Sequence, residues 1–117
     1  MTDVIIYHNP RCSKSRETLA LLHENNVKPE IVLYLEEPPS EGELKAILNK
    51  LDMAPRELIR KGEKAYKDKN LGDTKLTDDE LIAAMIASPI LIERPIVVSG
   101  GAAKLGRPPE QVLEILT

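Results

Sequence analysis

The feature that most restricts the fold of this chain is a strand, turn and helix pattern near its start. Val4–Tyr7 is a short continuous apolar run, which is typical of a buried strand. A helical pattern follows from about Ser13 to Asn25, with Leu19 and Leu22 facing the core. A second apolar run, Ile31–Leu35, predicts a strand parallel to the first, because a helical crossover joins the two.

The middle of the chain is predicted to be helical. Ser40–Glu43 and Thr77–Glu80 have the spacing of capping boxes, and each precedes apolar residues at helical spacing. A short helical piece is expected within Asp52–Lys61, and an apolar linker at Pro89–Ile92. Between them, Lys61–Lys75 is polar and mixed in charge, so we expect a long surface segment there.

The last part of the chain predicts a hairpin and a closing helix. Ile96–Val98 is apolar and reads as a third strand, and Gly100-Gly101 is typical of a two-residue hairpin turn. Ala102–Leu105 would then be a fourth, weaker strand. Arg107-Pro108-Pro109 is expected to open a last helix, because proline is tolerated in a first helical turn.

These elements define a fold class. Their order is β-α-β-α, a helical insertion, then β-β-α, which predicts an α/β fold with a mixed four-stranded sheet and a thioredoxin-like layout. We expect a single domain over residues 1–117, with the helical insertion at about 40–88. In such a fold a cis proline introduces the third strand and faces the active cysteine, and Pro95 occupies the corresponding place.

Cys12 is the strongest candidate for chemistry. It falls at or just before the first turn of the first helix, where N–H groups and the positive end of the helix dipole gather. His8, Arg11, Lys14 and Arg16 add cationic groups close by. This setting favours a reactive thiolate, and it also suits a bound anion. The alternative is that Cys12 is an inert buried side chain.

The cysteine count restricts the mechanism. Cys12 is the only cysteine, and Ser15 stands where a dithiol motif would have its second thiol. No internal disulfide can form, so an oxidised Cys12 must be resolved by an outside thiol. A phosphatase-type loop is disfavoured because Thr18 occupies the position where that loop needs arginine.

Composition excludes several classes of partner. The net charge is −3, and the chain has three Tyr and no Phe or Trp, so we expect no nucleic-acid binding. No apolar run approaches the ~20 residues of a membrane span, and Met1–Asp3 shows no start of a secretory signal. With one unpaired cysteine, these features favour the cytoplasm.

No metal is expected, because His8, His23 and Cys12 lack metal-site spacing.

Several segments together resemble a known family. The chain resembles the bacterial arsenate reductases that use glutathione and glutaredoxin, usually called ArsC. The matching segments span nearly the whole chain, in order: Tyr7–Arg16, Leu33–Glu36, Arg56–Lys61, Ile90–Val98 and Gly106–Pro108.

The resemblance implies roles for individual residues. The active cysteine corresponds to Cys12, and three arginines that bind the arsenic oxyanion correspond to Arg60, Arg94 and Arg107. His8 matches a histidine that helps to lower the thiol pKa, and Ser15 matches a hydroxyl next to the sulfur. The chemistry is consistent with this, since the planar fork of arginine binds two oxygens of a tetrahedral anion at once.

The function implied is reduction of arsenate to arsenite. The Cys12 thiolate would attack the oxyanion, and glutathione as co-substrate and glutaredoxin would resolve the adduct, with no bound cofactor and with the protein as a monomer. Two alternatives remain open. One is a monothiol glutathione-dependent reductase of another substrate, and the other is a non-enzymatic regulator of the same fold that binds RNA polymerase.

Overall fold

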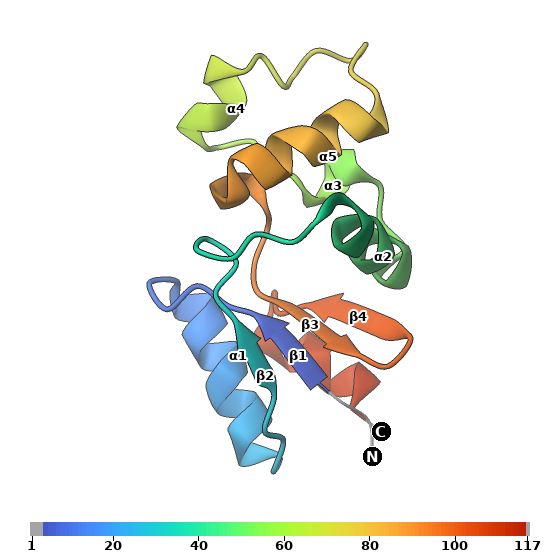
Figure 1. The fold of residues 1–117 in the computed structure, drawn as a ribbon. Helices are drawn as coiled ribbons and strands as arrows, with labels where there is room; N and C mark the ends of the chain where they lie inside the picture. The colour runs from blue at the N-terminus through green and yellow to red at the C-terminus, as the bar shows by residue number, and fades with distance from the viewer. Residues whose placement is uncertain (1–3, 117) are drawn as a thin grey trace. The chain divides into compact units, whose positions relative to one another are not determined.

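A mixed four-stranded sheet is built from the first and last parts of the chain (Figure 1). The computed structural model describes residues 4–116, so Met1–Asp3, which bear on the expectation about a secretory signal, lie outside it. The strands are β1 (Val4–Tyr7), β2 (Glu30–Val32), β3 (Ile96–Ser99) and β4 (Ala102–Leu105), in the order β2-β1-β3-β4. β1 and β2 are parallel, as predicted, and the other pairs are antiparallel.

The hairpin between β3 and β4 is confirmed. Ser99 pairs with Ala102, so the turn consists of Gly100 and Gly101 alone. Gly100 has a φ of 59°, a backbone conformation that glycine adopts without a steric penalty. β3 ends at Ser99, one residue beyond the predicted end.

The second strand is shorter than predicted. β2 ends at Val32, because the Leu33 carbonyl accepts hydrogen bonds from the N–H groups of Glu36 and Glu37 and closes a turn. Tyr34 is buried although it lies outside the strand. Tyr34 is the only buried residue of this apolar run, and Ile31 and Leu35 are exposed.

One face of the sheet is covered by α1 (Ser13–Glu24) and η2 (Pro109–Ile115). Their shared core contains fully buried Ile6, Leu22, Val97 and Val112. The predicted last α-helix is wrong in type, because η2 is a 3-10 helix. Its three-residue repeat places Val112 and Ile115 on the same side, and both pack against this core.

Residues Pro38–Glu93 form a second compact unit, which we call the helical unit; residues up to Glu37 and from Arg94 onward form the sheet unit. The expectation of a single domain over residues 1–117 stays a prediction. The elements of the helical unit are α2 (Glu41–Leu51), α3 (Pro55–Leu58), α4 (Lys64–Asp68), α5 (Asp78–Ala87) and η1 (Pro89–Leu91).

Both predicted capping boxes are present in the helical unit. Ser40 and Glu43 satisfy each other's backbone N–H groups at the start of α2, and Thr77 and Glu80 do the same at α5. The apolar residues that follow each box are largely buried: Leu44, Ile47, Leu48, Leu81, Ile82 and Met85.

The structure adds detail to the predictions for the other segments of this unit. The segment Lys61–Lys75 lies largely on the surface, as predicted, although it contains the short helix α4 and its Leu71 is buried. Arg56 orders it by donating hydrogen bonds to the carbonyls of Leu71 and Asp73. The short helical piece expected within Asp52–Lys61 is confirmed as α3, which begins at Pro55, and the linker Pro89–Ile92 contains η1.

No helix within residues 4–116 is long and apolar enough to cross a membrane.

Candidate active site

The loop from β1 to α1 is fixed by hydrogen bonds on both sides of Cys12. Cys12 is the N-cap residue of α1, as predicted, and its N–H donates to the Asn9 carbonyl at 3.0 Å. The Asn9 side-chain oxygen accepts from the Arg11 N–H at 3.0 Å, and Arg16 donates to the Pro10 carbonyl at 2.9 Å. The sulfur is therefore held at a defined place at the start of the helix.

The Cys12 thiol is buried, with 8% of the residue exposed, but its pKa lies below the ordinary value. Burial alone raises the pKa, because it penalises the charged thiolate. Hydrogen bonds from the backbone N–H groups of Ser15 and Lys14, together with the charges of Arg94 and Arg107, outweigh that effect. The site thus favours a nucleophilic thiolate.

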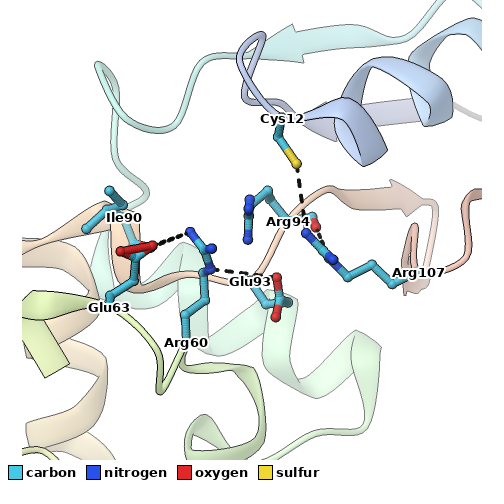
Figure 2. A network of polar contacts seen from close by, with 7 residues as sticks. All are labelled: Cys12, Arg60, Glu63, Ile90, Glu93, Arg94 and Arg107. Carbon is cyan, nitrogen blue, oxygen red and sulfur yellow. Dashed lines mark hydrogen bonds and ion pairs between the residues drawn. The ribbon is translucent and has the colours of Figure 1, made fainter.

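Arg107 lies against the sulfur, as Figure 2 shows. Its Nη2 is 3.8 Å from Cys12 Sγ, and its Nε donates a 2.8 Å hydrogen bond to the Arg94 carbonyl. The peptide bond between Arg94 and Pro95 is cis, as expected for the predicted thioredoxin-like fold, and the bond between Arg107 and Pro108 is cis as well. Residues from the start of β3 and the end of β4 thus meet the start of α1.

His8 and Ser15 form a buried pair beside the cysteine loop. His8 Nδ1 and Ser15 Oγ are 2.6 Å apart, and Ser15 Oγ also accepts from the Asn9 N–H at 3.0 Å. Burial, followed by the charge of Arg16, lowers the pKa of His8, so its imidazole is neutral near pH 7. The expected effect of His8 on the pKa of the thiol stays a prediction. In the structure, His8 is linked to the cysteine loop through Ser15.

Arg60 lies in the helical unit and has acidic partners there (Figure 2). Its Nη1 is 2.7 Å from a carboxylate oxygen of Glu63 and 3.4 Å from the Ile90 carbonyl, and its Nε is 3.9 Å from a Glu93 oxygen. Its expected role in binding an oxyanion stays a prediction.

The chain matches a known protein family over most of its length. The model of the ArsC family matches residues 7–115. The chain belongs to the ArsC family. Its predicted thioredoxin-like α/β fold, with a four-stranded mixed sheet, is confirmed.

Several similar proteins support the ArsC assignment. Uncharacterized protein YfgD of Escherichia coli strain K12 is 59% identical over 97% of this chain and 96% of its own. The arsenate reductase of Haemophilus influenzae is 52% identical, with 97% and 98% covered. The solved structure of the arsenate reductase from Vibrio cholerae has a TM-score of 0.96 and 56% identity, with 98% of each chain covered.

Some residues of this ArsC site were not predicted from the sequence. Asn9 shapes the loop, and the only signal for it is an Asx residue before a proline. Thr18 is fully buried behind the site, next to Gly106. A glycine directly before Arg107 is the one feature that could have indicated this contact.

The helical unit of this ArsC protein contains a separate open cavity of about 550 Å³. Its lining includes Leu48, Met53 and Ile82 with acidic Asp52, Asp78 and Asp79, and none of the predicted site residues. Within residues 4–116, no three His, Cys, Asp or Glu side chains are placed to hold a metal ion.

Proposed function

We propose that this protein reduces arsenate to arsenite, with the Cys12 thiolate as the nucleophile. The observation that carries the proposal is the Cys12 thiol itself: its pKa is lowered, and the Arg107 guanidinium lies 3.8 Å from its sulfur. Membership of the ArsC family and the arsenate reductases among its relatives supply the substrate.

The first step is a substitution at arsenic. The Cys12 sulfur forms a bond to arsenic(V), and one arsenate oxygen leaves as water after it takes a proton. Arg94 and Arg107 hold the remaining oxygens, because guanidinium groups stabilise the charge of a tetrahedral oxyanion. Arsenic remains pentavalent in this step.

The two electrons for the reduction come from thiols outside the chain, because Cys12 is the only cysteine. A glutathione thiol forms a second sulfur–arsenic bond as another water leaves. A glutaredoxin thiolate then attacks the glutathione sulfur, a mixed disulfide forms, and the electron pair of the broken bond stays on arsenic as arsenic(III). Water cleaves the bond from Cys12 to arsenic, which releases arsenite and restores the thiol.

The test is arsenite formation by wild type and Cys12→Ser, with glutathione and glutaredoxin both present. We expect turnover in the wild type and none in the variant, with an unchanged circular dichroism spectrum. Normal arsenate reduction by Cys12→Ser would contradict the nucleophile assignment. Omitting glutaredoxin tests the resolving step separately, since turnover at full rate without it would remove glutaredoxin from the mechanism.

A second candidate is a monothiol reductase that acts with glutathione on another substrate. The observation that favours it is the same lone, activated thiol, which would also attack a disulfide. Rates with arsenate and with a model glutathione mixed disulfide distinguish the two candidates.

A further inference from the structure

Gly106 lies between two elements of the sheet unit with no room for a side chain. A Cβ atom at this position would clash with Thr18 Oγ1 on α1, and would lie 2.7 Å from the ring carbon Cγ of Pro95. The Gly106 N–H also donates a 3.0 Å hydrogen bond to the Pro95 carbonyl, which fixes the distance between the two segments.

Neither neighbour can easily give way. Thr18 is fully buried, its side chain is branched at Cβ, and its hydroxyl donates a 2.8 Å hydrogen bond to the Lys14 carbonyl. The ring of Pro95 is buried and rigid. A methyl group at residue 106 would therefore displace the backbone of residue 106 itself, because close-packed interiors have no spare volume.

We propose that Gly106 is a positioning residue for the thiol. Its missing side chain lets the end of β4 approach α1 and Pro95, and this approach places the next residue, Arg107, against Cys12. The Arg107 guanidinium is then held between the Arg94 carbonyl, 2.8 Å from its Nε, and the sulfur, 3.8 Å from its Nη2. The consequence for arsenate turnover rests on the proposed function, but the consequence for the thiol does not.

The test is the pH profile of Cys12 alkylation by iodoacetamide in Gly106→Ala. We expect the profile to shift to higher pH and the rate near pH 7 to fall by roughly threefold or more, because Arg107 moves away from the sulfur. The matched control is Gly101→Ala, where a Cβ would meet nothing within 4 Å, and its profile should equal that of the wild type. An unchanged profile in Gly106→Ala overturns the proposal.

A double-mutant cycle distinguishes positioning from a general structural role. In an Arg107→Gln background the guanidinium is already absent, so Gly106→Ala should cause no further shift in the alkylation profile. An equal shift with and without Arg107 overturns the proposal. Thr18→Ala removes the clashing hydroxyl, so the pair Thr18→Ala and Gly106→Ala should recover part of the wild-type rate. Failure of Gly106→Ala to fold, alone and with Thr18→Ala, also counts against the proposal.

Arsenite formation by the same variants keeps this inference separate from the proposed function. A wild type that does not reduce arsenate, together with a shifted alkylation profile in Gly106→Ala, would overturn the substrate and leave the role of Gly106 intact. Arsenate turnover in the wild type, together with an unchanged alkylation profile in Gly106→Ala, would leave the substrate intact and overturn the role of Gly106.

Discussion

Arg107 in the sheet unit and Arg60 in the helical unit are both predicted to bind the oxyanion, yet their surroundings differ. Arg107 contacts a sulfur and a backbone carbonyl, and its charge helps to lower the pKa of Cys12. Arg60 is paired with the carboxylates of Glu63 and Glu93. An anion that binds Arg60 must compete with these carboxylates, which weakens the binding of an anion to Arg60.

Among the arginine substitutions, the largest effect is expected from Arg94→Lys in the sheet unit. Lysine keeps the positive charge near Cys12 but loses the planar fork, so kcat/KM for arsenate should fall by roughly a hundredfold. Steady-state kinetics measure this, with Lys104→Gln as a control because Lys104 forms an exposed pair with Glu114. Unchanged kinetics in Arg94→Lys would remove this residue from the site.

A smaller effect is expected from Arg60 in the helical unit. Arg60→Lys should raise the KM for arsenate by roughly tenfold if the predicted role holds. Glu63→Gln should instead lower the KM a few-fold, because it removes the carboxylate 2.7 Å from Arg60 that competes with the anion. If neither variant changes the KM, Arg60 does not bind the anion, in contrast to the role expected of Arg107, and its pairing is structural.

A change of stability without a change of reactivity is expected from Ser40→Ala. It removes the side chain that caps α2 and should lower the free energy of unfolding by about 1 kcal/mol. Urea denaturation measures the loss, and Cys12 alkylation should proceed at the wild-type rate. A slower alkylation would show that the thiol depends on the stability of the helical unit.

The smallest effect is expected from His8, and only in mildly acidic solution. Because burial and Arg16 lower its pKa in the folded protein, the unfolded chain takes up the proton first as the pH falls below the ordinary value of 6.5. The stability that neutral His8 contributes is fully present above that pH and is lost as the pH approaches the lowered pKa. Urea denaturation at several pH values should show less of this loss in His8→Asn. Equal pH dependence in the two proteins would contradict the lowered pKa.

Features encoded by neighbouring residues could be predicted from the sequence. Cys12 at the helix start, the capping boxes at Ser40 and Thr77 and the turn at Gly100-Gly101 each depend on a few adjacent side chains. Each pattern favours one local structure, and this preference does not depend on the rest of the fold.

Features that depend on distant residues could not be predicted. Arg56 binds carbonyls in the loop after α4 that lie more than ten residues away, so the order of this loop could not be predicted from its own composition. The contact of Gly106 with Thr18 and Pro95 joins three separate segments of the chain. The pairing of Arg60 with Glu93 likewise depends on the Ile59–Ile92 bridge, which brings the two segments together.

The order of elements along the chain has a consequence for synthesis on the ribosome. β1, α1 and β2 are made first, but β3, which pairs with β1, follows only after the whole of Pro38–Glu93. While those residues are translated, the hydrogen-bonding edge of β1 that will receive β3 has no strand to pair with. The nascent chain is therefore most prone to aggregation in that interval, because it cannot yet close its sheet.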